Sequence, residues 1–229
     1  IFERLPRLVP VEDGDVSKEL ARAFKKRGIR VETGARVEKV ERTKSAVKLR
    51  ATLDGGKEET FEFDKLLVGV GRKPMTENIG LDTIKVEVEK GYIKTDGYMR
   101  TGTPGVYAIG DIVAGMPWLA HAASMEGCIA VAHIAGKPTQ KIRKDRIPGV
   151  TFTEPGIGSI GLTEAQAKAQ GYKVKVGKFP FVGNSKASII GHHEGFVKVV
   201  ADEKFGEILG VHIIGPHAYE LIGEAVAAM

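Results

Sequence analysis

The sequence lacks the features that mark several large classes of protein. Only one of its 229 residues is a cysteine, Cys128, so the chain forms no internal disulfide, which fits a reducing compartment. Its place in the apolar stretch Cys128–Ala132 predicts a buried, inert thiol rather than a nucleophile. No apolar run approaches the roughly 18 residues that a membrane-spanning helix needs, so we expect no membrane span. Because the chain starts at Ile1 and ends at Met229 inside a helical pattern, we expect a piece of a longer protein.

An excess of one charge is present, but it is small and dispersed. The net charge is +5, and lysines and arginines alternate with acids along most of the chain, as in Glu38-Lys39 and Glu41-Arg42. The densest basic run, Lys141–Arg146, contains an aspartate and no aromatic residue on which a base could stack. This pattern favours a solvated connector, and we expect no nucleic-acid partner.

The first section of the chain, residues 1–73, alternates strand and helix patterns as a parallel α/β unit does. A strand ends in the acid Glu3, and an amphipathic helix follows between Asp15 and Gly28. A parallel partner strand is predicted at Ile29–Glu32. A three-stranded antiparallel meander follows, with its last turn at Asp54-Gly55-Gly56 and its strands at Val37–Val40, Ala46–Leu53 and Thr60–Phe63. A fully buried strand is predicted at Leu66–Val70.

The other two sections differ in their patterns. Residues 74–146 contain a helix at about Leu119–Ala135, which Gly136 ends. Residues 147–229 alternate strands with isolated helices and therefore predict an α+β domain. Its strands are expected near 150–161, 173–181, 195–201 and 206–214, and its helices near 163–170 and 218–228. The predicted fold class is α/β plus α+β.

Residues 101–111 form the most informative local pattern. The apolar run Val106–Ile109 predicts a short buried strand that ends in Gly110 and Asp111. Gly110 lets a ligand approach the backbone, and Asp111 places a carboxylate where open α/β sheets bind ligands. A carboxylate accepts hydrogen bonds from hydroxyls, which suits ribose or ribityl. The alternative is a helix N-cap or turn residue.

A literal glycine fingerprint at Gly156–Gly161 does not meet the conditions of a dinucleotide site. Such a fingerprint must follow a strand and open a helix at its third glycine. Here Glu154-Pro155 interrupts the approach, and the next helix begins at Thr163, where Gln166 completes a capping box. We expect no nucleotide at these glycines.

The histidines give no metal site. His192, His193, His212 and His217 form no helical pair four residues apart and have no thiolate beside them. We expect histidines on a loop or strand surface, and no metal.

The 101–111 segment resembles the flavin-binding signature of the pyridine nucleotide–disulfide oxidoreductases. Downstream, Pro117–His121 with Ala123 and Glu126-Gly127 is similar to the dihydrolipoamide dehydrogenase branch of that family. The resemblance covers the whole chain and implies a two-dinucleotide-domain flavoprotein. It makes residues 1–73 the end of an NAD-binding domain, 74–146 the end of an FAD-binding domain, and 147–229 an interface (dimerisation) domain.

The resemblance also assigns cofactor contacts. Taken alone, Glu3 is a surface carboxylate, Val37 a strand core residue and Gly71 a strand-end turn; the family places all three against NAD. His121 is then orienting or structural rather than catalytic, and no catalytic residue is assigned in the chain. The FAD contacts implied are Asp111, which binds the ribityl, with Gly110, Leu119, Ala120 and His121.

The implied activity is reoxidation of dihydrolipoyl groups on 2-oxo-acid dehydrogenase complexes, with electrons passing through a redox disulfide and FAD to NAD. Glu3 favours NAD over NADP, although Arg4 lies beside it. A homodimer through residues 147–229, partners in the lipoyl domain and acyltransferase core, and a cytoplasmic or mitochondrial-matrix location follow from the same resemblance. The family's redox cysteines and His-Glu pair lie outside this chain, so we expect it to be inactive alone.

Three alternatives remain open at this point. The chain is part of another flavin disulfide reductase, or a non-catalytic fragment that binds a partner through residues 147–229, or a nucleic-acid binder supported only by charge. One departure from the family is Gly156, where an acid is usual, which predicts a locally looser strand.

Overall fold

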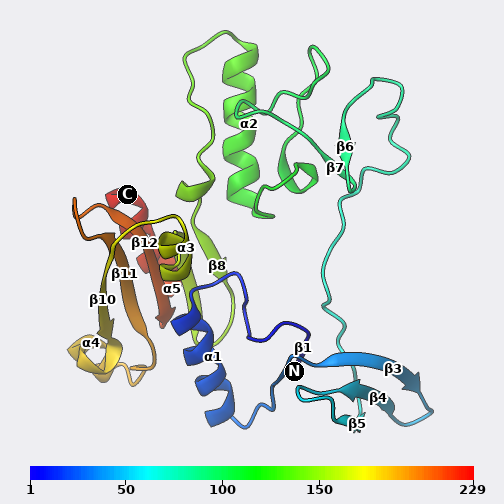
Figure 1. The fold of residues 1–229 in the computed structure, drawn as a ribbon, viewed down its shortest axis with the longest axis vertical. Coiled ribbons are helices and arrows are strands. Elements are labelled where there is room, and N and C mark those ends of the chain that lie inside the picture. Colours follow the sequence, from blue (N-terminus) through cyan, green and yellow to red (C-terminus); the bar gives the residue numbers. More distant parts are fainter. The chain divides into compact units, whose positions relative to one another are not determined.

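A computed structural model describes residues 1–229 as two compact units (Figure 1). The first unit comprises residues 1–68 and 148–229, and the second comprises residues 69–147. The three-domain division expected from the sequence stays a prediction. No helix has both the length and the apolar character that a membrane span requires.

The first unit opens with the predicted parallel α/β arrangement. Strand β1 (Phe2–Glu3) pairs in parallel with β2 (Glu32–Thr33), and helix α1 (Gly14–Lys26) connects them. The Asp13 side chain caps α1 by accepting the Asp15 amide at 3.0 Å, and Gly28 ends the helical segment with a φ of 76°. The parallel partner strand predicted at Ile29–Glu32 is confirmed, but it begins later in the sequence, at Glu32, and is only two residues long.

The predicted meander is confirmed. Strands β3 (Arg36–Arg42), β4 (Val47–Thr52) and β5 (Glu58–Phe63) pair antiparallel in that order, and Gly55 and Gly56 turn the last hairpin with positive φ. One face is apolar, because Leu49, Ala51 and Phe61 are buried together against Phe2.

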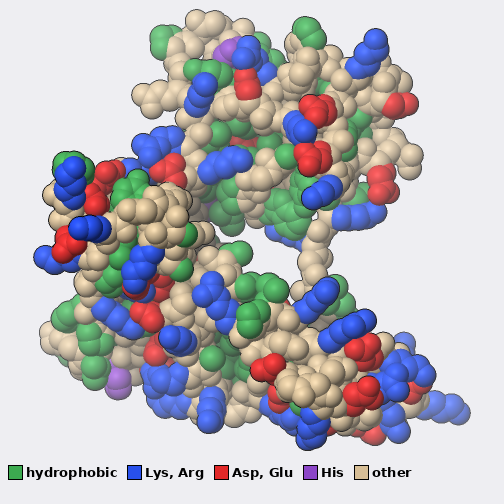
Figure 2. Space-filling view, viewed as in Figure 1, with side chains coloured by type: hydrophobic (Ala, Val, Ile, Leu, Met, Phe, Trp, Pro, Cys, Tyr) green, Lys and Arg blue, Asp and Glu red, His purple; other side chains and the backbone are tan.

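The other face of the meander carries ion pairs. Lys39 pairs with Glu41, and Lys48 lies 3.7 Å from Glu62. Figure 2 shows basic and acidic side chains interspersed in the same way on the visible surface. The interleaving of charges along the sequence thus becomes pairing in space, and exposed pairs of this kind contribute little to stability.

The rest of the first unit is a five-stranded antiparallel sheet in the order β10-β11-β12-β9-β8. The predicted α+β section is confirmed, and the glycine fingerprint lies inside a strand, β9. The Thr163–Gln166 capping box is present. The elements are β8 (Gly149–Thr151), β9 (Gly156–Gly161), α3 (Glu164–Ala169), β10 (Val174–Pro180), α4 (Ser185–Ile189), β11 (Phe196–Asp202), β12 (Ile208–Gly215) and α5 (Ala218–Ala228).

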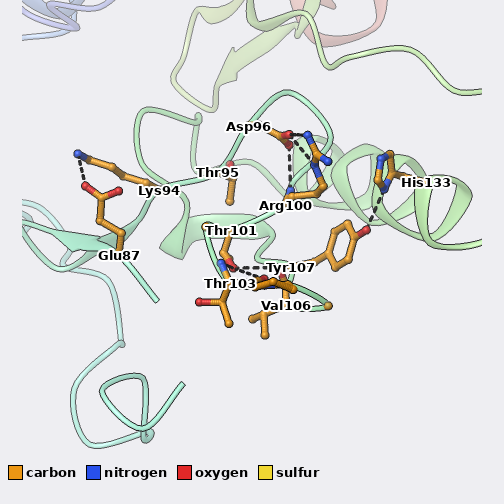
Figure 3. Close-up of a pocket in the computed structure, with 13 residues that line it drawn as sticks. Glu87, Lys94, Thr95, Asp96, Arg100, Thr101, Thr103, Val106, Tyr107 and His133 are labelled. Atoms are coloured by element: carbon orange, nitrogen blue, oxygen red, sulfur yellow. Dashed lines mark hydrogen bonds and ion pairs between the residues drawn. The ribbon is translucent and has the colours of Figure 1, made fainter. Parts of the chain in front are cut away.

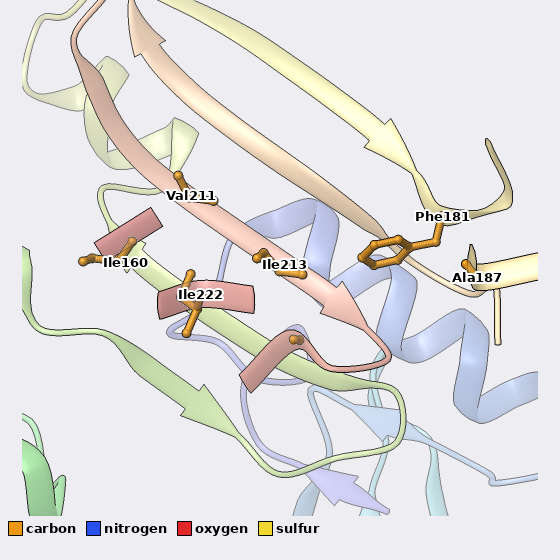
Figure 4. Close-up of a cluster of buried hydrophobic side chains, with 7 residues drawn as sticks. Ile160, Phe181, Ala187, Val211, Ile213 and Ile222 are labelled. Carbon is orange, nitrogen blue, oxygen red and sulfur yellow. The ribbon is translucent and has the colours of Figure 1, made fainter. Parts of the chain in front are cut away.

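Both faces of this sheet are covered. Helix α5 covers one face, where Ile160, Val211 and Ile213 of the sheet pack against Ile222 (Figure 4). Helix α1 covers the opposite face. Leu20 and Val16 of α1 pack there against Ile157, Phe196 and Ile214. Strand β12 is central and therefore has no solvent-facing side.

A lysine is buried on the face of the sheet covered by α1. Lys198 of β11 and Asp13 each have only 2% of their side chain exposed. The Lys198 ammonium donates to Asp13 at 2.8 Å, to Asp15 at 3.0 Å and to Glu164 at 2.7 Å. One buried cation thus ties the start of α1 and the start of α3 to the sheet.

These contacts shift the pKa values of the partners. Burial opposes ionisation of Asp13, but its hydrogen bond from Lys198 and those from the amides of Asp15 and Glu164 outweigh burial and lower its pKa. Asp15 behaves likewise. The pKa of Glu164 is lowered by hydrogen bonds from Lys168 and Lys198. Burial opposes the charge on Lys198, yet its carboxylate partners raise its pKa above the ordinary value.

His212 corrects the expectation of surface histidines. It pairs with Lys198 across β11 and β12 and is 1% exposed, with Nε2 3.0 Å from the Leu162 carbonyl. Burial lowers its pKa against the opposing effects of that carbonyl and of Asp13 and Glu12. The expectation failed because a central strand covered on both faces has no surface positions. His192, His193 and His217 are exposed.

The second unit has little regular structure apart from one long helix. Helix α2 (Ala120–Ile134) confirms the helix predicted at Leu119–Ala135. The core of the second unit consists of Val86, Ile93, Ala108, Val113 and Met116. The remaining elements are β6 (Val88–Glu89), β7 (Tyr92–Ile93) and the 3₁₀ turns η1 (Gly110–Ile112) and η2 (Lys144–Arg146).

Two predicted buried strands are wrong. Leu66–Val70 pairs with no strand, and Leu67 and Val70 are 95% and 93% exposed. Val106–Ile109 is extended but makes only one bridge, between Tyr107 and Arg100. Both apolar runs have the composition of central strands in a parallel sheet, and this chain has no neighbouring strand to pair with them.

The prediction of a buried Cys128 is also wrong, because its side chain is exposed on α2. The helix is apolar on nearly all sides, yet only one of its faces packs within the chain, and Met125 and Val131 are exposed too. Composition therefore could not tell the packed face from the open one.

Replacing the buried lysine tests its role in stability. We expect Lys198→Met to lower the free energy of unfolding by about 3–5 kcal/mol, because Asp13 is left as a buried carboxylate without its cation. Lys48→Met, which breaks an exposed pair, is the control and should change it by less than about 1 kcal/mol. Urea unfolding measures both, and equal stability of the two variants would contradict the assignment.

The same cluster predicts a dependence on acid. The pKa values of Asp13, Asp15 and Glu164 are lowered on folding from ordinary values of 3.8, 3.8 and 4.5. Their contribution is therefore complete above those ordinary values and is lost as the pH falls through the lower native values. We expect the unfolding free energy to decline below about pH 4.5, and to decline less steeply in Lys198→Met. Parallel curves for the two proteins would refute this.

Candidate functional site

The predicted flavin motif folds as a tight turn. Ile109 is extended, Gly110 follows with a φ of 78°, and the Val113 amide donates to the Gly110 carbonyl at 2.9 Å to close η1. Only glycine adopts this left-handed conformation readily. The turn presents the Asp111 side chain outward with 51% of it exposed. An accessible acceptor therefore follows directly on a backbone bend, as the sequence predicts.

Helix α2 packs behind this turn. The buried carboxyl of Glu126 accepts the Gly110 amide through Oε2 at 2.6 Å. Ala123 lies one turn earlier on the same face, with its Cβ 3.6 Å from where a Cβ on Gly110 would stand. Small residues thus let helix and turn approach closely.

Arg72 lies on the open side of the turn. Its guanidinium donates to Asp111 Oδ2 at 3.2 Å and to the Trp118 carbonyl at 3.4 Å. The same group stacks on the indole of Trp118, 4.7 Å from the ring centre, and Tyr92 lies on Trp118 at 6.0 Å. The Asp111 carboxylate therefore has a cation beside it and an aromatic wall nearby.

The first turn of α2 contains the other predicted FAD contacts. Leu119 is the N-cap, and its side chain makes no capping hydrogen bond. Ala120 and His121 begin the helix and are exposed. The first amides of a helix have no partner within it and carry partial positive charge, so this end favours an electron-rich acceptor. Since α2 packs on η1, the structure brings this end together with Asp111.

The predicted NAD contacts fall in two places. Glu3 ends β1, where its Oε1 accepts the Leu5 amide at 2.8 Å and its carbonyl accepts the Ala35 amide at 3.0 Å. That second bond links the end of β1 to the start of β3, where Val37 is 44% exposed at a bulge. Gly71 belongs to the second unit and has a φ of 127° with open space around it. The structure thus associates Glu3 with Val37, and the NAD roles of all three stay predictions.

The second unit also contains a pocket of about 600 Å³ lined by Glu87, by residues 94–96 and 100–107, and by His133 (Figure 3). Its charged groups are paired within the pocket. Arg100 binds Asp96 at 2.7 Å, Lys94 binds Glu87 at 2.6 Å, and the Tyr107 hydroxyl lies 2.8 Å from His133. None of the predicted site residues lines it, so this pocket adds no group to the site.

The sequence pattern assigns no role at the turn to three residues that the structure places there. Arg72 lies 39 positions from Asp111 and gave no local signal. Trp118 is the single tryptophan of the chain and stands just before the helix, and this position is the signal that marks it as an aromatic wall. Glu126 belongs to the Glu126-Gly127 motif, and a single carboxylate on an otherwise apolar helix is the signal for its buried contact.

The cover that Arg72 gives to the single tryptophan can be measured. We expect Arg72→Ala to increase quenching of Trp118 fluorescence by acrylamide, because the guanidinium no longer lies over the indole. Lys73→Ala is the matched control, since Lys73 pairs with Glu77 at 3.0 Å. Equal quenching in the Arg72 variant and the parent would show that the stack is absent in solution.

Comparison with known proteins agrees with the geometry. The family model of the pyridine nucleotide-disulphide oxidoreductases matches residues 1–127, and the family model of their dimerisation domain matches residues 147–229. The chain is 44% identical over 224 residues to a dihydrolipoyl dehydrogenase of Chlorobaculum tepidum and 41% identical over 227 residues to that of Bacillus subtilis. Each alignment covers 98% of this chain and 48% of the relative, so the chain spans about half the length of these relatives.

Solved structures give the same result. The crystal structure of LpdA from Mycobacterium tuberculosis superposes with a TM-score of 0.88 at 29% identity, covering 99% of this chain and 49% of that one. The flavoprotein disulfide reductase RclA from Escherichia coli gives 0.87 at 22% identity, covering 100% and 52%, and supports the fold alone. Because the family model matches more than half of the residues, the chain belongs to the pyridine nucleotide-disulphide oxidoreductase family.

Proposed function

We propose that this chain is part of a dihydrolipoyl dehydrogenase and supplies one side of its FAD site, part of its NAD site and its dimer surface. The observation that carries the proposal is the outward Asp111 carboxylate on the Gly110 turn, packed against the start of α2, in a chain closely related to such enzymes. The enzyme would oxidise dihydrolipoyl groups of a 2-oxo-acid dehydrogenase complex and reduce NAD.

The donor and acceptor groups of the turn fit FAD. Asp111 offers an accessible carboxylate, which accepts hydrogen bonds from ribityl hydroxyls. The exposed first turn of α2, with Leu119, Ala120 and His121, offers amide donors to the electron-rich acceptor atoms of a flavin ring. Arg72 supplies a cation that can pair with Asp111 or with an anionic part of the cofactor. Bound FAD would supply hydride transfer between the dithiol and NAD.

The NAD side depends on Glu3. One of its oxygens is held by the Leu5 amide, which fixes the side chain and leaves the second oxygen for ribose hydroxyls. A carboxylate there disfavours the 2′-phosphate of NADP by charge repulsion. Val37 would pack on the adenine end and Gly71 would let the nicotinamide half pass close to the backbone.

Thiol chemistry needs groups from elsewhere in the parent protein. Cys128 is the single cysteine and has no second cysteine with which to form a redox disulfide. The dithiol pair and the His-Glu base would therefore come from parts of the relatives that this chain does not match. This chain would bind and orient both cofactors.

Residues 147–229 would form the dimer interface. They match the family's dimerisation domain and leave large apolar side chains exposed, among them Phe152, Val182, Ile189 and Phe205. Exposed apolar groups of this size favour burial between subunits. The lipoyl domain and the acyltransferase core of the complex would be the further partners.

A chimera tests the proposal. In it this chain replaces the matched region of the Chlorobaculum tepidum enzyme, whose own sequence supplies the rest. We expect a yellow dimer that reduces NAD with dihydrolipoamide. Asp111→Ala should weaken FAD binding about tenfold to a hundredfold, because charge-assisted hydrogen bonds to the ribityl are lost. The absorbance of bound flavin after dialysis gives the measure, and Asp145→Ala, a carboxylate outside the site, is the control.

Other outcomes would identify the alternatives. A folded chimera without flavin, in conditions where the parental enzyme is yellow, contradicts the proposal. A colourless dimer of the 229-residue chain that captures a protein through residues 147–229 would favour the non-catalytic fragment. A flavoprotein that accepts a different dithiol would favour another disulfide reductase.

A further inference from the structure

Glu126 is the one fully buried carboxylate of α2. It has 0% of its surface exposed, on a helix face shared with the buried apolar residues Ala122, Ile129 and Ala130. Its Oε2 accepts the Gly110 amide at 2.6 Å, whereas its Oε1 has no hydrogen-bond partner. No lysine, arginine or histidine forms an ion pair with it.

Such an arrangement is costly for stability. A buried carboxyl oxygen without a donor loses its hydration and gains nothing in return. A leucine or methionine at the same position would fill the space between helix and turn without that cost. A purely structural role for position 126 therefore does not explain the acid, and the explanation must lie in what its other oxygen holds.

Oε2 of Glu126 accepts the amide of Gly110, the residue that precedes Asp111 in the flavin motif. Gly110 is left-handed, and the next residue is Asp111, so the orientation of the Gly110 peptide determines where the Asp111 carboxylate stands. A hydrogen bond from an amide to a carboxylate is short and about twice as strong as a neutral one. The 2.6 Å distance agrees with that kind of bond.

The residues around Glu126 serve the same contact. Glu126 and Gly127 lie three and four positions after Ala123, so both neighbour it on the side of the helix toward the turn. The Ile109 side chain reaches to 3.5 Å from where a Cβ on Gly127 would stand. A Cβ there would be in ordinary van der Waals contact with Ile109, so Gly127 lets the helix lie close to the segment that leads into the turn.

We propose that Glu126 is a positioning residue of the flavin site, which fixes the Gly110 peptide and thereby places the Asp111 carboxylate for the ribityl chain. This inference rests on the proposed function for its flavin part. It gives the Glu-Gly pair of the motif a physical role that is separate from any contact with the cofactor.

The first test uses the 229-residue chain and the NMR resonance of the Gly110 amide. We expect Glu126→Ala to move the Gly110 amide proton upfield and to raise its exchange rate with solvent, because the bond to the carboxylate is gone. Glu126→Gln keeps an acceptor oxygen and should give an intermediate shift. Ile129→Ala removes a buried side chain from the same helix and should leave the Gly110 resonance in place.

The second test uses flavin affinity in the chimera described above. We expect Glu126→Ala to raise the dissociation constant for FAD about tenfold, and Glu126→Gln to stay within about threefold of the parent. Ile129→Ala should match the parent within about twofold, because it lowers stability without touching the turn. Rescue by glutamine separates positioning from general loss of packing.

Each outcome has a defined meaning. An unchanged Gly110 resonance in Glu126→Ala overturns the inference, and so does a shifted resonance with unchanged FAD affinity. A parental chimera that binds no FAD overturns the proposed function, while the Gly110 resonance still decides whether Glu126 fixes the turn. If Glu126→Ala fails to fold, Glu126→Gln and Glu126→Met supply the same comparison.

Discussion

The first unit depends on one buried ammonium group. Lys198 binds Asp13, Asp15 and Glu164, and each of these acids stands at the beginning of a helix. Asp13 also caps α1 and accepts the Glu164 amide at 3.1 Å. An apolar contact of equal area would tolerate sliding of α1 over the sheet, whereas a cation with three directed partners specifies one arrangement. The strand that ends in Glu3 is connected to that helix and belongs to the same unit.

The second unit uses a buried charge in a comparable way. Glu126 lies under the Gly110 turn as Lys198 lies under the start of α1, and in both cases a buried ionisable side chain is bonded to the residues that begin a local element. The turn itself has few other constraints, because the extended segment before it makes a single bridge. Packing of α2 and the bond to Gly110 therefore set the geometry of Asp111, and Arg72 balances the charge of Asp111 on the open side.

Local signals allowed much of this to be predicted from the sequence. Caps and periodicity gave α1 and α2, the glycine turn gave the meander, and the conditions on a glycine fingerprint excluded Gly156–Gly161. Features that depend on distant neighbours were not predictable. Leu66–Val70 has strand composition without a partner strand, and burial of His212 and Lys198 follows from helices covering both faces of the sheet. At the site, Asp111 was found from its motif, but Arg72 approaches it from a remote segment.

The most direct test of the central claim is a crystal structure of the flavin-loaded chimera. The account predicts that the Asp111 carboxylate lies within hydrogen-bonding distance of a ribityl hydroxyl, with the Glu126–Gly110 bond retained and the start of α2 facing the flavin ring. A flavin bound away from Asp111, or a Gly110 turn that has left Glu126 while the ribityl is held by other residues, would contradict it.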